Sequence, residues 1–133
     1  MKIINRWKIL ASVVAFAAAS TMFAQEAPTY SRDVAPILQD KCASCHNPEG
    51  IGPMPLLTYE QVRPFALLIK DRTTKRIMPP WHLDPNVGIQ EFKNDMSLSE
   101  QEITTLSVWV DAGALEGDRA DLPAPLKIAS GAA

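Results

Sequence analysis

The stretch Cys42-Ala43-Ser44-Cys45-His46 has the spacing C-x-x-C-H, and the interpretation of the rest of the chain depends on it. Two thiols at this spacing can each form a thioether with one vinyl group of a single porphyrin, and the next histidine then lies under the iron as its proximal ligand. The chain of 133 residues has only these 2 cysteines, so it can hold at most one haem by this route. The stretch therefore predicts one c-type haem, attached through Cys42 and Cys45, with its iron bound by His46.

The same residues are compatible with three other kinds of site. A thioredoxin-like redox pair belongs in a βαβ unit, and the sequence has no such pattern. A zinc site could add His82 to Cys42, Cys45 and His46, but zinc sites use spaced pairs of ligands rather than adjacent ones. A disulfide between Cys42 and Cys45 would close a very small loop and stabilise the fold little. Haem attachment is therefore the preferred interpretation.

Residues 1–24 have the pattern of a secretory signal peptide. Three basic residues precede an apolar run over 9–19, and small residues follow up to Ala24. We expect cleavage after Ala24, with cleavage after Ser20 as the alternative. A retained membrane anchor is less favoured, because the apolar run is shorter than the roughly 20 residues that a span needs.

Removal of this leader would leave one small domain over residues 25–122 and a flexible tail over 123–133. All 15 acidic residues follow the leader, but 3 of the 13 basic residues lie within it, so 10 basic residues face 15 acidic ones and the net charge is −5. This balance argues against nucleic acid as a partner. A covalently held apolar cofactor can fill the centre of so small a core.

The apolar periodicity predicts an all-α domain with three main helices and long loops. Ser31 is expected to cap the first helix, which runs toward Lys41 and leads into the C-x-x-C-H turn. Pro36 lies close enough to the start of this helix to be tolerated. The proline- and glycine-rich segment 47–57 is expected to be a loop.

Two capping boxes predict where the other helices begin. The first box is Thr58 to Gln61, and Pro64 is expected to bend the helix that follows it. The second box is Ser99 to Glu102, and its helix is expected to end near Gly113. The apolar faces of the two helices are predicted to comprise Val62, Phe65, Leu68 and Ile69, and Ile103, Leu106, Trp109 and Val110.

Four residues are candidates for the sixth iron ligand: Met54, Met78, Met96 and His82. Met78 is preferred, because it follows the second helix and the prolines at 79–80 stiffen the backbone that supports its weak thioether. Met54 is close to His46 in sequence and is expected on the proximal side, whereas Met96 is expected to be exposed. His82 is the main rival, since bis-histidine haem is common. Methionines more often fill cores than bind iron.

Two further residues are expected to lie near the haem. A proximal histidine usually donates its second ring N–H to a carbonyl oxygen, and the carbonyl of Pro53 is the predicted acceptor because proline restricts its direction. The alternative is that Gly52-Pro53 is simply a turn. Trp81 could donate its indole N–H to a haem propionate, although such a residue is more often part of the core.

Together, these motifs resemble a class I mono-haem cytochrome c. More closely, the chain is similar to small bacterial haem domains that carry Asp-Val-Ala-Pro-Ile-Leu before the cysteines, Met-Pro-Pro-Trp-His, and Trp-Val-Asp-Ala-Gly-Ala, here at 33–38, 78–82 and 109–114. The likeness covers roughly residues 30–118. It implies a cytochrome c-like fold in which the first and last helices pack together beside the haem. It also implies a periplasmic location, because haem is attached to such proteins outside the cytoplasm.

The expected function is one-electron transfer between redox protein partners, with the iron bound by His46 and Met78 and no catalytic residue. Two alternatives remain open. One is a haem enzyme or gas sensor whose sixth coordination position is open or displaceable. The other is a haem subunit of a larger oxidoreductase. After removal of the leader, no membrane span is expected.

Overall fold

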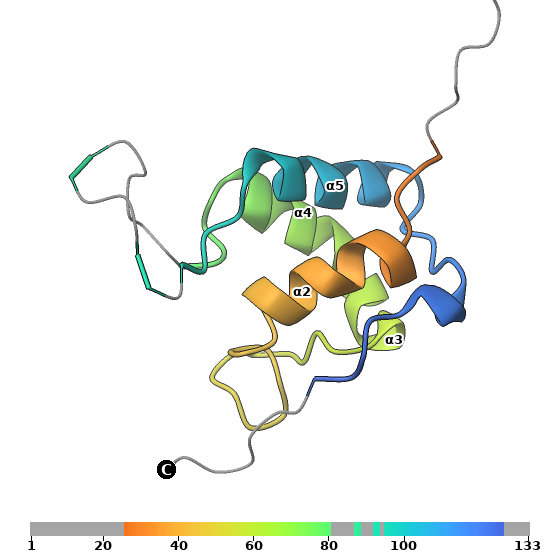
Figure 1. Cartoon of the computed structure of the whole chain (residues 1–133), viewed down its shortest axis with the longest axis horizontal. Coiled ribbons are helices and arrows are strands. Elements are labelled where there is room, and N and C mark those ends of the chain that lie inside the picture. The colour runs from red at the N-terminus through yellow and green to blue at the C-terminus, as the bar shows by residue number, and fades with distance from the viewer. Residues whose placement is uncertain (1–25, 81–86, 89–91, 94, 127–133) are drawn as a thin grey trace, which may run out of the picture.

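The computed structural model describes residues 26–80, 87–88, 92–93 and 95–126. Within these residues every regular element is helical, and three main helical segments are present (Figure 1), as the sequence predicts. None of the described helices is long and apolar enough to cross a membrane. The predicted leader and residues 127–133 of the predicted tail lie outside the described residues.

The first helical segment starts as a π-helix, η1 (Tyr30–Val34), and continues as α2 (Ala35–Lys41). Thr29, not Ser31, caps it, since the Thr29 hydroxyl accepts a hydrogen bond from the Arg32 N–H. The predicted cap at Ser31 is wrong. Ser31 lies inside the first turn, fully buried, and its hydroxyl oxygen has no hydrogen-bond partner.

Long-range backbone bonds explain this shift of the helix start. The N–H groups of Tyr30 and Ser31 donate to the carbonyl oxygens of Leu115 and Glu116, each at 2.9 Å. These bonds place Tyr30 and Ser31 against the segment after the last helix, so the cap falls one position before Tyr30. Pro36 lies in the first turn of α2, a position at which proline is tolerated, as predicted.

The second segment comprises α3 (Tyr59–Val62), the 3₁₀ turn η2 (Arg63–Phe65) and α4 (Ala66–Thr74). Its predicted capping box is present. The Thr58 hydroxyl oxygen accepts a hydrogen bond from the Gln61 N–H, and the Gln61 side-chain oxygen accepts one from the Thr58 N–H. The predicted distortion at Pro64 is also present, because the 3₁₀ turn contains this proline.

The tight turn at Pro64 changes which residues of α4 face inward. A 3₁₀ turn rotates the chain more per residue than an α-helix does. Ala66 and Ile69 are therefore buried beyond the turn, whereas Leu68, which the sequence places on the apolar face, is 41% exposed.

The third segment is α5 (Glu100–Asp111), followed by a short 3₁₀ turn, η3 (Arg119–Asp121). The capping box of Ser99 and Glu102 is present as predicted, and the helix ends two residues before Gly113, which adopts a left-handed conformation with φ of 97°. The apolar stripe also follows the prediction: Ile103 is partly buried, and Leu106, Trp109 and Val110 are buried.

Three aromatic residues, one from each helical segment, pack together. Helices α4 and α5 lie side by side, and η1 packs against α5 (Figure 1). The ring of Tyr30 lies 5.5 Å from that of Tyr59 and 6.4 Å from that of Trp109, centroid to centroid. The Trp109 indole N–H donates to the Leu115 carbonyl oxygen at 2.9 Å. The expected packing of the first helix against the last is thus present, and it fixes the helix that leads to the cysteines.

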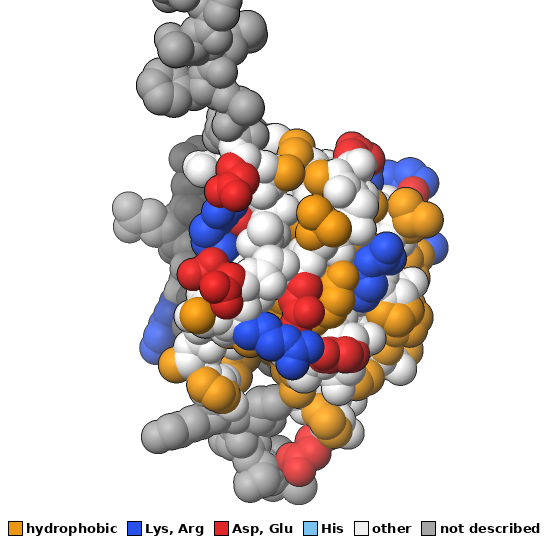
Figure 2. All heavy atoms as spheres, turned by 90° about the vertical axis from the view of Figure 1, so that its right-hand side faces the viewer, with side chains coloured by type: hydrophobic (Ala, Val, Ile, Leu, Met, Phe, Trp, Pro, Cys, Tyr) orange, Lys and Arg blue, Asp and Glu red, His pale blue; other side chains and the backbone are white. Residues whose placement is uncertain are grey.

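Figure 2 shows one face of the molecule, on which acidic and basic side chains lie beside one another. Exposed ion pairs among the described residues include Arg119 with Glu60 at 2.7 Å and Arg32 with Glu26 at 3.2 Å. Exposed pairs of this kind contribute little to stability, because water screens them. This face therefore has no extended area of positive charge.

Candidate functional site

The cysteines lie in a tight turn directly after α2. The N–H groups of Cys42 and Ala43 both donate to the Leu38 carbonyl oxygen, at 3.0 and 2.9 Å. Those of Cys45 and His46 both donate to the Cys42 carbonyl oxygen, at 3.1 and 2.9 Å. Leu38 and Ala43 are buried, which anchors the turn to the core. The yellow loop below α2 in Figure 1 contains this turn and the segment after it.

Both thiols and the histidine line one cavity of about 340 Å³, which we call the cysteine cavity. Its volume is within the range of about 300–1,000 Å³ that is usual for small-molecule and cofactor sites. Its other walls come from segment 51–53, from segment 78–80 and from Met96. The predicted site residues that line this cavity are Cys42, Cys45, His46, Pro53 and Met78.

The two thiols are free of one another, since neither takes part in a disulfide. Burial, with smaller contributions from the nearby Cys45 and Glu102, raises the pKa of the Cys42 thiol to about 12. This thiol is therefore protonated near neutral pH. A redox-active cysteine pair needs a readily formed thiolate, so this environment does not favour the thioredoxin-like interpretation.

The loop after the turn holds the imidazole of His46 through a backbone carbonyl. Its Nδ1–H donates to the Met54 carbonyl oxygen at 2.9 Å. The predicted acceptor, the carbonyl of Pro53, is therefore wrong by one residue. The loop folds back because the Leu56 N–H donates to the His46 carbonyl oxygen, also at 2.9 Å, and this bond brings the Met54 carbonyl to the ring. With Nδ1 occupied in this way, Nε2 is left to bind a metal.

Gly52 allows the loop to pass close to the histidine. A Cβ atom at this position would lie 2.6 Å from the His46 Nδ1 and 2.8 Å from the Cys45 carbonyl oxygen, well inside van der Waals contact. Gly50 is equally constrained, because a Cβ atom there would also collide with the Cys45 carbonyl group. The two glycines thus permit an approach that any side chain would prevent.

Asn47 is a site residue that the sequence interpretation missed. Its amide donates to the carbonyl oxygens of Ala43 and Ser44 at 2.9 and 3.1 Å, and its side-chain oxygen accepts from the Glu49 N–H at 2.9 Å. The residue is buried, so it joins the C-x-x-C-H turn to the loop that follows. The available signal was its position, since asparagine commonly bonds nearby backbone in turns.

The structure separates the candidates for the sixth ligand. Met78 and Met96 both line the cysteine cavity, whereas the partly buried Met54 packs against the hydrophobic core. The expectation that Met96 is exposed is wrong, because it is half-buried. Its neighbour Leu98 is buried in the core and draws the segment inward. Trp81 and His82 lie outside the described residues.

In the part of the chain that the structure describes, no three His, Cys, Asp or Glu side chains lie close enough together to hold a metal ion. A zinc site at Cys42, Cys45 and His46 would also need His82, which lies outside the described residues. Cys42, Cys45 and His46 do have the donor set that attachment of one porphyrin requires: two thiols at C-x-x-C spacing and an imidazole with an available nitrogen. The residues present fit a covalent haem.

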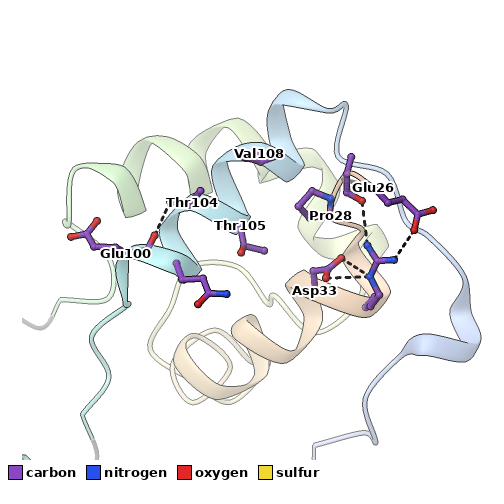
Figure 3. Close-up of a pocket in the computed structure, with 10 residues that line it drawn as sticks. Glu26, Pro28, Asp33, Glu100, Thr104, Thr105 and Val108 are labelled. Carbon is purple, nitrogen blue, oxygen red and sulfur yellow. Dashed lines mark hydrogen bonds and ion pairs between the residues drawn. The ribbon is translucent and has the colours of Figure 1, made fainter. Parts of the chain in front are cut away.

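A second hollow, of about 900 Å³, lies between η1 and α5 (Figure 3). Charged residues at its rim already have partners: Arg32 pairs with Glu26 and Asp33, and Glu100 pairs with Arg76. Its lining contains no cysteine, histidine or methionine. The cysteine cavity is therefore the better candidate for a redox cofactor.

Comparisons of the chain with protein-family models, with curated proteins and with solved structures found no match.

Proposed function

We propose that this protein is a periplasmic electron carrier with one covalently attached c-type haem and a cytochrome c-like fold. In this proposal Cys42 and Cys45 hold the porphyrin, His46 is the proximal iron ligand and Met78 is the distal one. The observation that supports it best is that one cavity is lined by both thiols, by His46 and by a methionine thioether. When bound, the haem iron supplies a ferrous–ferric couple that moves single electrons.

The residues around the cavity suit this role. The Met54 carbonyl accepts the Nδ1–H of His46, which orients the imidazole and makes it a stronger donor. The apolar side chains of Ile51, Pro53 and Pro79 are among those that line the cavity, which suits a largely apolar cofactor. A neutral thioether from Met78 favours ferrous over ferric iron, so we expect a higher reduction potential than with two histidines.

The leader over residues 1–24 completes the proposal. Its removal during export would release the haem domain into the periplasm, where redox protein partners donate and accept the electron. N-terminal sequencing of the exported protein tests this part. A product that begins at Gln25 supports it, and a membrane-bound product that begins at Met1 contradicts it.

One observation favours a second candidate function. Met78 is 39% exposed and belongs to a segment without regular secondary structure, so an external ligand could displace it. The protein would then be a haem enzyme or a gas sensor. Binding of carbon monoxide to the ferrous protein separates the two functions: rapid binding without unfolding supports the second candidate, and slow binding supports the electron carrier.

A further candidate, a haem subunit of a larger oxidoreductase, has its own support. Ile51 is 93% exposed at the edge of the cavity, and such an apolar side chain suits a protein contact. Co-purification of a catalytic chain with the haem protein would support this role.

Mass spectrometry of the denatured mature protein tests haem attachment itself. We expect the mass of the chain plus one haem, and we expect Cys42→Ala to retain at most one thioether. Haem that acid and organic solvent extract from the wild-type protein would contradict the proposal.

The ferric spectrum tests the distal ligand. We expect a weak far-red sulfur-to-iron charge-transfer band in wild type and in His82→Ala. If this band is absent from wild type and His82→Ala opens the sixth position, then His82 is the distal ligand and Met78 is not.

A further inference from the structure

The cysteine cavity is lined by two thioether side chains, not one. Met78 and Met96 are 18 positions apart in the sequence, yet both line the cavity that contains the two cysteines and His46. Neither residue packs against the hydrophobic core. Met54 does so, which is the ordinary role of a methionine. Met96 therefore needs an explanation other than core packing.

Hydrogen bonds on both sides hold Met96 at the cavity. On one side, the Lys41 ammonium group donates to the Asp95 carbonyl oxygen at 3.2 Å. Lys41 immediately precedes Cys42 and itself lines the cavity, so this bond ties the Met96 segment to the cysteine turn. The Ser97 N–H also donates to the Asp95 carboxylate at 2.8 Å and stabilises the turn around Met96.

On the other side, Leu98 anchors the segment to the core. Its side chain is only 5% exposed, and its carbonyl oxygen accepts a hydrogen bond from the Arg76 guanidinium group at 3.2 Å. Ser99, the next residue, caps α5. Met96 thus lies between two fixed points and is half-buried, whereas Met78 is 39% exposed.

We propose that Met96 is a reserve axial ligand: a second thioether at the same cavity that takes the sixth coordination position when Met78 leaves it. This inference rests on the proposed function, because it requires the covalent haem with His46 and Met78 as ligands. Met78 is exposed and its thioether is a weak ligand, whereas hydrogen bonds on both sides hold the segment that carries Met96. When Met78 leaves the iron, Met96 therefore takes its place, and the sixth position does not open to external ligands.

Spectra of four purified ferric proteins test the proposal: wild type, Met78→Ala, Met96→Ala and the double variant. The far-red sulfur-to-iron band is expected in wild type and in both single variants, and its loss is expected only in the double variant. Carbon monoxide is expected to bind rapidly only to the ferrous double variant. Far-UV circular dichroism of each protein confirms that it has folded, which the exposure of Met78 favours.

Other results would overturn the proposal. If Met78→Ala alone loses the band and binds carbon monoxide as fast as the double variant, Met96 is not a ligand, although the proposed function stands. A low-spin Met78→Ala spectrum without the sulfur band would assign the replacement to a nitrogen donor such as Lys41. If Met96→Ala alone loses the band, Met96 is the native ligand rather than the reserve. A wild-type protein without the band would overturn both this inference and the ligation by Met78.

Discussion

The Nδ1 atom of His46 lies 2.9 Å from the carbonyl oxygen of Met54, so the backbone of the loop orients the imidazole. This hydrogen bond spans eight residues and depends on the path of the chain through segment 50–53. At Gly52 the chain passes so close to the ring that a Cβ atom would lie 2.6 Å from Nδ1. The contact between loop and imidazole therefore leaves no room for a side chain at position 52.

Gly52→Ala is expected to disrupt this contact. The new methyl group would lie 2.6 Å from Nδ1, so the ring or the loop must move and the hydrogen bond to Met54 is lost. We expect a lower yield of covalent haem, or a ferrous protein that binds carbon monoxide more readily. Absorbance of haem per mole of protein measures the first effect.

Pro53→Ala is the matched control for this change. Pro53 is exposed and its carbonyl is not the acceptor, so its replacement is expected to leave haem content near the wild-type value. Equal losses in the two variants would show that the loop tolerates no change at all, and would contradict a specific role for Gly52.

Asn47→Ala is expected to destabilise the cysteine turn. The side chain makes three hydrogen bonds to the backbone and is 7% exposed, so its removal leaves buried polar groups without partners. The free energy of unfolding should fall by about 1–3 kcal/mol. Unfolding in guanidinium chloride measures this change, with the exposed Ser44→Ala as the control. A loss for Asn47→Ala no larger than that for Ser44→Ala would contradict the role of Asn47.

Alanine at positions 29 and 31 should affect the free energy of unfolding differently. Thr29→Ala removes the helix cap and should lower the free energy of unfolding by about 1 kcal/mol. Ser31→Ala removes a buried hydroxyl group that has no partner, so it should leave the stability unchanged or raise it. Thermal unfolding of both variants distinguishes these outcomes, and a larger loss for Ser31→Ala would restore Ser31 as the cap.

Stability should fall at alkaline pH in part through Tyr30. Burial, with the nearby Glu60 and Glu116, raises the pKa of Tyr30 to about 12. The folded state thus favours the neutral phenol. Its contribution to stability is complete below the unfolded pKa of about 10, and it is lost as the pH rises toward the folded value. Unfolding measured across this range should show a weaker pH dependence for Tyr30→Phe than for wild type. Identical slopes would exclude Tyr30 as the cause.

Features that depend on neighbouring residues could be predicted from the sequence. The capping boxes at Thr58 and Ser99, the break at Pro64 and the buried stripe of α5 are all as predicted. Each arises from interactions within one or two helical turns. The C-x-x-C-H turn also follows from local spacing, because its hydrogen bonds join residues three to five positions apart.

Features that depend on distant contacts were predicted less well. Met96 borders the cavity because Lys41, 54 positions from Asp95, holds its segment there. The acceptor for His46 is one residue beyond the predicted carbonyl, since the exact path of a loop depends on which backbone groups it meets.

The sequence by itself therefore determined the chemistry of the candidate site and the helical class of the fold. The types and spacing of Cys42, Cys45 and His46 specify the donor set, and short-range capping and periodicity specify the helices. Only the tertiary structure decided which carbonyl holds His46, and which methionines line the cavity. The first outcome depends on the exact path of a loop, where a shift of a single residue exchanges one partner for another, and the second depends on contacts between segments far apart in the chain.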